Sequence, residues 1–176
     1  MKNIARNKIK RALFIGRFQP FHHGHLHIAK TLSKKFDELI IGIGSSQEKN
    51  TKENPFSYNE RKKMIQNTLK NNKIKNSKIY PIPDLYDDFK WTNYILENLP
   101  KFNVAYSGND WTIRCFKKYK IKAVKIKLIR GLSSTKIREL IKNNKSWENL
   151  VPKEIYSQIK KIKGVEKVKK IYSISS

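Results

Sequence analysis

Histidines gather in one short segment of this chain, and the imidazole is the side chain that binds metals, moves protons and contacts phosphates near neutral pH. The segment reads FIGRFQPFHHGHLH, and it contains every histidine of the sequence, namely His22, His23, His25 and His27. Three interpretations compete: a metal site, a phosphate site, and solvent-exposed histidines at the start of a helix. A zinc site often recruits carboxylates. This segment contains none, which disfavours a metal.

The position of the histidines in the chain favours the phosphate site. An apolar run at 11–17 predicts a strand, and the apolar residues of 26–36 recur at helical spacing. A helix that begins behind a strand offers unpaired N–H groups and a partial positive charge to phosphate oxygens. His22 and His25, three residues apart, can point at one anion. Gly24 between them lacks a side chain and leaves room for a phosphate to approach the backbone.

The end of the predicted strand supplies two further groups. Gly16 permits a tight exit from the strand, and Arg17 adds a positive charge near the same anion. His27 lies two residues beyond His25, a spacing that does not share a helix face. We therefore predict that His23 and His27 lie outside the site and tolerate mutation.

Strands and helices alternate along the rest of the chain. The expected strands lie at 11–17, 38–46, 78–82, 103–108 and 123–129. Helices are expected at 23–36, 57–72, 91–99 and 110–119, and two more at 134–144 and 152–162 close the chain. Ser57 and Glu60 have capping-box spacing, and Pro152 suits a first helical turn. This order predicts an α/β fold: a Rossmann-like, mostly parallel sheet with helices on both faces and a helical C-terminus.

Length and composition predict one soluble domain with a strongly basic surface. The 176 residues suit a single core, which we assign to 11–176, and residues 1–10 form a basic extension that we expect to be flexible. There are 39 lysines and arginines against 14 acidic residues, a net charge of +25 that attracts anions. No run of about 20 apolar residues would span a membrane, so we expect a cytoplasmic protein. The single cysteine, Cys115, excludes an intramolecular disulfide.

Two motifs resemble those of a known family. The segment GRFQPFHHGH is similar to the signature of the HxGH nucleotidylyltransferase superfamily, in the form found in archaeal-type nicotinamide mononucleotide (NMN) adenylyltransferases. Near the other end, GLSSTKIRE at 131–139 resembles the ISSTxxR motif of the same superfamily. The resemblance spans nearly the whole chain after the first ten residues.

The resemblance implies transfer of AMP from ATP to NMN, which gives NAD and pyrophosphate by direct attack without a covalent enzyme intermediate. It implies that the catalytic residues are His22, His25, Arg17 and Arg138. It implies an ATP site formed by Gly16, Arg17, Phe18, His22, Gly24, His25, Gly108, Asn109, Ser133, Ser134, Thr135 and Arg138. Mg²⁺ is the expected cofactor, bound mainly through ATP phosphates, and no protein ligand for a metal is assigned.

The NMN site is implied at Gly44, Ser45, Ser46, Asp84 and Trp91. A tryptophan face suits a flat cationic ring such as nicotinamide. A tryptophan early in an amphipathic helix is as often a core residue, and both interpretations of Trp91 stay open. Some relatives carry an arginine before the PF of the second loop. Here the loop reads EKNTKENPF, and Lys49 or Lys52 would replace that arginine.

Two other functions stay open at this point. A sister nucleotidylyltransferase acting on phosphopantetheine or flavin mononucleotide (FMN) would share both motifs. A noncatalytic nucleic-acid-binding module would explain the charge, but no signature organises the scattered lysines, and we expect no specific nucleic-acid partner. The resemblance further implies a homo-oligomer, with a hexamer as one possibility, and no membrane partner.

Overall fold

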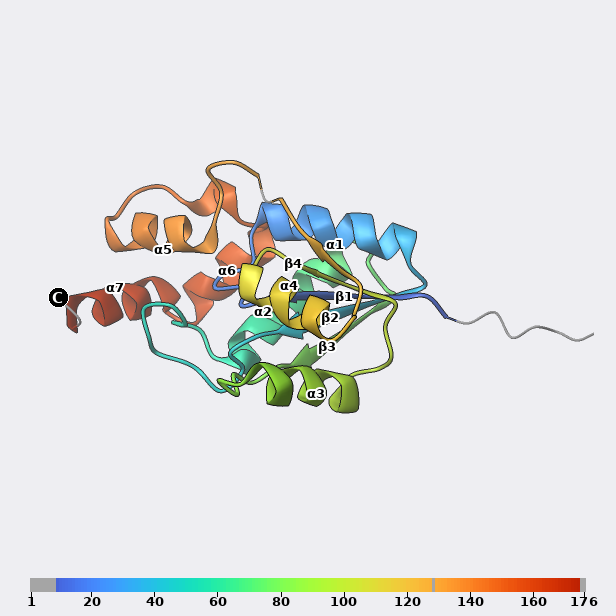
Figure 1. Ribbon diagram of the computed structural model, residues 1–176. Helices are drawn as coiled ribbons and strands as arrows, with labels where there is room; N and C mark the ends of the chain where they lie inside the picture. The colour runs from blue at the N-terminus through green and yellow to red at the C-terminus, as the bar shows by residue number, and fades with distance from the viewer. Residues whose placement is uncertain (1–8, 128, 175–176) are drawn as a thin grey trace, which may run out of the picture.

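A parallel sheet forms the centre of the molecule. The computed structural model describes residues 9–127 and 129–174, and within them the strands pair in the order β3-β2-β1-β4-β5, each pair parallel (Figure 1). The strands are β1 Arg11–Gly16, β2 Glu38–Ile43, β3 Ser77–Pro81, β4 Val104–Ser107 and β5 Ala123–Lys125. The predicted Rossmann-like α/β fold is confirmed.

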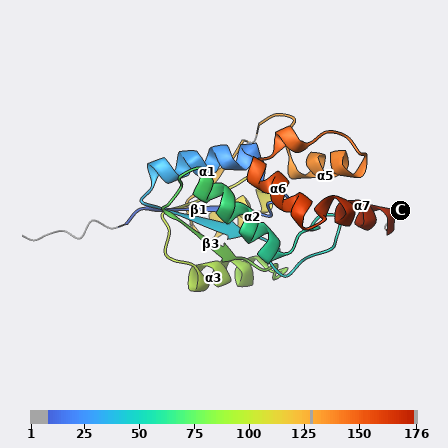
Figure 2. The same ribbon diagram turned by 180° about the vertical axis from the view of Figure 1, so that it is seen from behind.

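Helices cover both faces of this sheet. They are α1 His23–Lys35, α2 Tyr58–Asn71, α3 Asp88–Asn98, α4 Asp110–Lys118, α5 Ser134–Lys142, α6 Lys153–Lys161 and α7 Gly164–Ile174, with a 3₁₀ turn at Glu148–Leu150. In both ribbon views α1 lies on one side of the sheet and α3 on the other, while α5 and α7 lie at the end of the molecule away from the start of β1 (Figures 1 and 2).

The alternation of side chains along β1 explains the two layers. Ala12 and Phe14 belong to a core shared with α1, α2, α5, α6 and α7, whereas Leu13 and Ile15 belong to a second core beneath α3 and α4. Successive residues of a strand point to opposite faces. Because both faces are covered, β1 is apolar without interruption from Ala12 to Ile15, as buried parallel strands are.

Two expected strands, those at 38–46 and 123–129, are longer than the observed ones by more than two residues. β5 was expected at 123–129 but covers three residues, because its neighbour β4 ends at Ser107, which pairs with Lys125. Residue 128 lies outside the described part of the chain. β2 was expected to reach Ser46, but it ends at Ile43 beside Gly16, the last residue of β1. In each case the neighbouring strand determines where pairing stops.

The C-terminal helices also differ from the prediction. Two helices were expected, and within the described residues a third, α7, follows α6. The break between them is Lys163, which has a left-handed φ of 53° that a lysine seldom adopts. Pro152 is the N-cap of α6 and not part of its first turn. Gly164 follows this break as the first residue of α7, and a Cβ there would lie 2.9 Å from the Phe56 ring, so α7 packs closely at this point.

The capping box of α2 is confirmed, and α7 is anchored to it. The Ser57 N–H donates to the Glu60 carboxylate at 2.7 Å, and the Glu60 N–H donates to the Ser57 hydroxyl at 3.3 Å. Lys167 Nζ of α7 donates to both oxygens of the same Glu60 carboxylate, at 2.9 and 3.0 Å. The C-terminal helix is thus tied to the start of α2.

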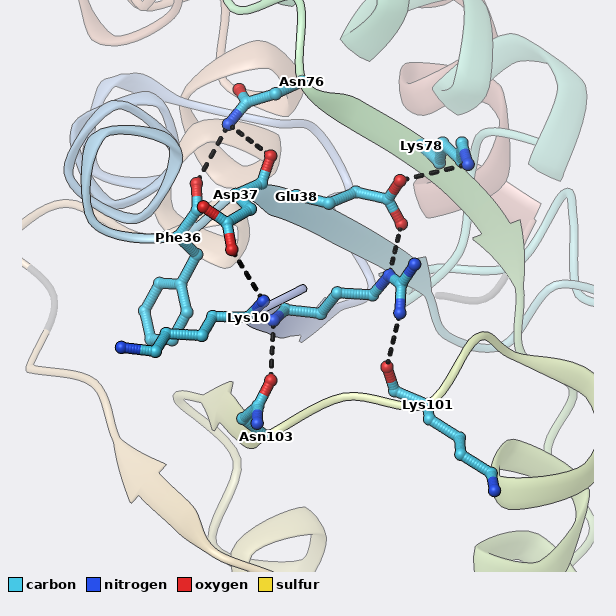
Figure 3. Close-up of polar contacts among 9 residues, drawn as sticks. Lys10, Phe36, Asp37, Glu38, Asn76, Lys78, Lys101 and Asn103 are labelled. Atoms are coloured by element: carbon cyan, nitrogen blue, oxygen red, sulfur yellow. Dashed lines mark hydrogen bonds and ion pairs between the residues drawn. The ribbon is translucent and has the colours of Figure 1, made fainter. Parts of the chain in front are cut away.

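At the amino ends of the strands, polar side chains hold the sheet together (Figure 3). The Glu38 carboxylate pairs with Arg11 Nε at 2.9 Å and with Lys78 Nζ at 3.0 Å, which links β2 to both of its neighbours. The Lys10 N–H donates to the Asp37 carboxylate at 2.7 Å. Of the extension at 1–10, residues 1–8 lie outside the described residues, and its flexibility stays a prediction.

The packing of α7 leads to a stability prediction. Val168 is fully buried in the first core. We expect Val168→Ala to lower the free energy of unfolding by roughly 1–3 kcal/mol, because it leaves a cavity. The exposed Lys170 of the same helix supplies the control, and Lys170→Ala should change the value by less than about 0.5 kcal/mol. Urea denaturation of both variants checks this, and equal values would contradict the packing of α7.

Candidate active site

A cleft of about 330 Å³ lies at the carboxyl ends of β1 and β4. The strand order reverses between these two strands, and open α/β sheets bind ligands at such a point. Many residues that the sequence analysis assigned to substrates line it: Gly16, Arg17, Phe18, His25, Gly44, Ser45, Asp84, Trp91, Gly108, Asn109, Ser134, Thr135 and Arg138. The others, His22, Gly24, Ser46 and Ser133, are not among the lining residues.

His22 and His25 form a stacked pair at the start of α1. Their ring centroids are 3.6 Å apart and their planes differ by 20°. The His22 N–H donates to His25 Nδ1 at 3.2 Å, and the His25 N–H donates to His22 Nδ1 at 3.4 Å. Because each Nδ1 accepts a hydrogen bond, the proton of each neutral imidazole sits on Nε2. The pair therefore offers Nε2–H donors.

Burial keeps both imidazoles neutral at neutral pH. Burial is the main cause and the neighbouring His23 the second cause that together lower the pKa of His22 to about 4. Burial also lowers the pKa of His25 well below 6.5, with His22 as the second cause. The exposed His23 and His27 lie outside the cleft lining. In this site the two histidines are thus hydrogen-bond donors and not fixed cations.

The glycines of the first motif make room for side chains of the chain itself. A Cβ on Gly24 would lie 3.1 Å from the His22 ring, and a Cβ on Gly16 would lie 2.8 Å from the Phe18 ring. The sequence analysis gave Gly24 to the approach of a phosphate. In the structure Gly24 is buried and its open side faces His22, so its observed contact is with the imidazole pair.

The start of α5 lies against the histidine segment. The Ser134 hydroxyl donates to the Pro20 carbonyl at 2.9 Å, and the Ser133 hydroxyl caps the helix by accepting from the Lys136 N–H at 3.1 Å. Thr135 Oγ1 accepts from Arg138 Nη2 at 3.4 Å. All three hydroxyls therefore make hydrogen bonds to other groups of the protein. Because first-turn N–H groups have no intrahelical acceptor, those of Ser134 and Thr135 are the groups suited to an anion.

Arg138 is nearly buried, with 4% of its surface exposed. Its Nη1 donates to the Gln19 carbonyl at 2.9 Å. Within the described residues, two buried side-chain nitrogens have no hydrogen-bond partner, and these are Arg138 Nε and His22 Nε2. A buried donor without an acceptor costs about 1–3 kcal/mol. Arg138 of the second motif lines the cleft, whereas His22 of the first motif is fully buried and stacks on His25, which does line it.

A second set of residues lines the cleft at the exits of β2 and β3. Gly44 and the buried Ser45 line it directly, while the Ser46 N–H donates to the Ile82 carbonyl at 3.1 Å. Gln47 joins the two exits, since its Oε1 accepts from the Asp84 N–H at 3.0 Å and its Nε2 donates to the Asp84 carbonyl at 3.3 Å. Asp84 is thereby fixed at the rim of the cleft.

Trp91 is both a core residue and part of the cleft wall. Only 3% of its surface is exposed, and its ring lies 4.8 Å from that of Trp111 and 5.6 Å from that of Phe116, between centroids. Trp91 also lines the cleft. The two interpretations that the sequence left open are therefore compatible.

The sequence analysis did not assign several lining residues to the site, which are Phe14, Ile15, Gln19, Ser107, Trp111 and Thr112. Trp111 and Thr112 follow the exit of β4, and the rule that strand exits meet at one edge would have found them. No feature of the sequence indicates that Gln19 lines the cleft. Its side chain accepts from the Phe56 N–H at 3.0 Å and donates to the Phe56 carbonyl at 2.8 Å, a long-range pairing that only the fold creates.

The basic residues of the second loop do not line the cleft. Lys52 Nζ lies 5.8 Å from the centroid of the Tyr172 ring on α7, and Lys49 is exposed. Within the described residues, no three histidine, cysteine, aspartate or glutamate side chains are grouped as metal ligands. In the same part of the chain, no helix is long and apolar enough to cross a membrane.

Residues 13–165 match the model of the cytidylyltransferase-like family, a span that contains both motifs and the cleft. The chain belongs to the cytidylyltransferase-like family. Among curated members it is 42% identical over 167 residues to the nicotinamide-nucleotide adenylyltransferase of Saccharolobus solfataricus, covering 93% of this chain and 97% of that protein. It is 38% identical over 166 residues to the enzyme of the same name from Thermoplasma acidophilum, covering 93% of each.

Solved structures of this family share the fold. A bifunctional NMN adenylyltransferase/ADP ribose pyrophosphatase from Francisella tularensis, complexed with AMP and a manganese ion, has a TM-score of 0.77 at 23% identity. The match covers 94% of this chain but only 52% of that protein, so this chain spans about half of its length. A putative nicotinate-nucleotide adenylyltransferase from Vibrio parahaemolyticus has a TM-score of 0.61 at 18% identity, covering 86% and 99%.

The lowered pKa of His22 leads to a prediction about stability and pH. The native state prefers the neutral ring and the unfolded chain titrates near pH 6.5, so the contribution is complete above pH 6.5 and is lost as the pH falls towards about 4. The loss amounts to roughly 3 kcal/mol for this group. His22→Asn keeps a capping residue but removes the titration, and its stability should fall less than that of the wild type.

Urea denaturation at several pH values between 7 and about 4 measures this difference. The exposed His27 provides the matched control, and His27→Asn should keep the pH dependence of the wild type. If the free energy of unfolding of His22→Asn falls with pH as steeply as that of the wild type, the titration of His22 does not cause the pH dependence.

Proposed function

We propose that this chain is a nicotinamide-nucleotide adenylyltransferase that transfers AMP from ATP to NMN in NAD biosynthesis. The observation that carries the proposal is the cleft that His25 and Arg138, one from each motif, line together, with His22 stacked on His25 and with Arg138 Nε left without a partner. The names and close similarity of the archaeal relatives support the choice of reaction.

The chemistry needs positioned donors and no protein nucleophile. A 5′-phosphate oxygen of NMN attacks the α-phosphorus of ATP, the bond from that phosphorus to the α,β-bridging oxygen breaks, and pyrophosphate leaves with the electron pair. Negative charge grows on the oxygens of the leaving group. The Nε2–H groups of His22 and His25 and the first-turn N–H groups of α5 are aligned donors for it. Arg17 and Arg138 add positive charge from two sides of the cleft.

Mg²⁺ is the proposed cofactor. When bound, a divalent cation would bridge phosphate oxygens and neutralise part of the charge of ATP. The cleft offers Asp84 as a nearby carboxylate. We propose that the metal binds mainly through the phosphates and water, and that the donors of the chain hold those phosphates.

The adenosine part of ATP and the NMN are assigned to different strand exits along the cleft. Gly108 and Asn109 at the exit of β4 are proposed to contact the adenosine part of ATP. The exits of β2 and β3, with Gly44, Ser45 and Asp84, are proposed to receive NMN, and Ser46 supports them through its backbone. The part of Trp91 that lines the cleft would contact the nicotinamide ring.

Three further expectations remain predictions. A homo-oligomer, with a hexamer as one possibility, can be tested by light scattering after size-exclusion chromatography. A cytoplasmic location can be tested by fractionation. The net charge of +25 predicts only nonspecific, salt-sensitive binding to nucleic acid.

A panel of acceptors tests the proposed function. We expect pyrophosphate release from ATP with NMN as the acceptor, together with the formation of NAD, and much slower release with phosphopantetheine or FMN. Preference for one of these other acceptors would identify a sister nucleotidylyltransferase. No release above a heat-killed sample with any acceptor would refute the enzyme altogether and favour the nucleic-acid module.

Substitutions at the phosphate side test the roles of the donors. His25→Asn removes an Nε2–H donor and should lower kcat by on the order of 100-fold, as the loss of a transition-state donor does. The exposed neighbour His23 supplies the matched control, and His23→Asn should retain turnover. Steady-state kinetics with circular dichroism measures both. A kcat for His25→Asn equal to that of the control would exclude His25 from the reaction.

A further inference from the structure

Arg61 of α2 is a buried cation that the proposed reaction does not use. None of its surface is exposed, and it is the largest of the fully buried side chains in the described residues. Burial lowers its pKa to about 10, which the negative charge of Asp84 opposes. A charged group is retained in such a place only when its hydrogen bonds are well satisfied.

The partners of Arg61 are backbone carbonyls at the cleft. Its Nη1 donates to the carbonyls of Arg17 and Gly44, each at 2.7 Å. Its Nη2 donates to the Ser45 carbonyl at 2.9 Å, and its Nε donates to the Ser57 carbonyl at 3.3 Å. Arg17, Gly44 and Ser45 line the cleft. One guanidinium thus connects the exits of β1 and β2 to the start of α2.

Two of these carbonyls precede residues with unusual backbone conformations. Phe18 follows Arg17 and has a φ of 53°, and Ser45 follows Gly44 and has a φ of 48°. Residues other than glycine adopt such left-handed values at a cost, and surrounding contacts must hold them. The angle φ turns a residue against the peptide plane before it, and that plane carries the bonded carbonyl. Arg61 Nη1 therefore fixes both planes from which the left-handed residues start.

We propose that Arg61 is a positioning residue of the active site, which holds the exits of β1 and β2 in the left-handed conformations that orient Arg17 and Ser45 toward the substrates. The proposal rests on the proposed function. The planar fork of the guanidinium is essential to it, because its separate nitrogens reach separate carbonyls. The ammonium group of a lysine has one nitrogen and cannot hold all of them.

Arg61→Lys and Arg61→Ala test this role beside Arg114→Lys, a control at an exposed arginine on α4. Thermal unfolding and circular dichroism report the folded fraction of each variant. Steady-state kinetics gives kcat and the KM for ATP and for NMN per folded molecule. Arg61→Ala is also assayed with added guanidinium ion, which can occupy the space of the missing group.

We expect Arg61→Lys to remain folded and to lose on the order of 100-fold in kcat/KM, because misplaced groups lose catalytic alignment. Added guanidinium should restore part of the turnover of Arg61→Ala and leave Arg114→Lys unchanged. Kinetic constants of Arg61→Lys within about twofold of the wild type would overturn the proposal. A loss that matches the loss of folded protein would overturn it as well, because Arg61 would then support the fold alone.

Calorimetric titration with ATP separates this proposal from the proposed function. The titration needs no acceptor, so it reports the β1 exit even if NMN is not the substrate. A wild type that binds ATP but forms no NAD would refute the proposed function. In that case, weaker ATP binding by the folded Arg61→Lys variant than by the wild type would still support the positioning role. ATP binding by the variant that equals that of the wild type would overturn it.

Discussion

The parallel pairing of β1 with β2 on one side and β4 on the other is the constraint from which the site follows. Parallel strands bring their carboxyl ends to one edge, so the exits at Gly16, Ile43 and Ser107 meet there. Because the strand order reverses at β1, the helices that follow leave towards opposite faces, and a cleft opens between them. The polar bonds around Glu38 hold the other edge of the same strands.

Hydrogen bonds to the backbone hold the donor side chains at the cleft in fixed orientations. The imidazoles of His22 and His25 accept backbone N–H groups on one side, which leaves Nε2–H on the other. Arg138 donates to the Gln19 carbonyl and keeps Nε unpaired, and Arg61 holds the backbone behind the lining. Oriented donors suit a reaction in which charge grows on phosphate oxygens, because they need no reorganisation as it proceeds.

Local signals in the sequence predicted most of the helices and strands. The pairing of neighbouring strands decides where some of those strands end. The capping box at Ser57 and Glu60 is a contact between near neighbours, so its spacing alone located the start of α2. β5 is short because β4 stops at Ser107, a limit set by a different segment. The break before α7 lies at Lys163 and Gly164, and the structure needs a glycine there because a Cβ would lie 2.9 Å from the ring of Phe56, a residue far away in the chain. Strand pairing and helix packing are nonlocal, and one segment does not encode them.

The sequence by itself determined the parallel α/β fold and the two motifs, because hydrophobic period and residue type at short spacing are local properties. It also predicted that His22, His25 and Arg138 would face one region. Only the tertiary structure decided that His22 stacks behind His25, that the hydroxyl of Ser134 is used by Pro20, and that Trp91 is mostly core. Arg61 had no signal at all, since its acceptors come from segments far apart in the chain and meet only when the sheet has formed.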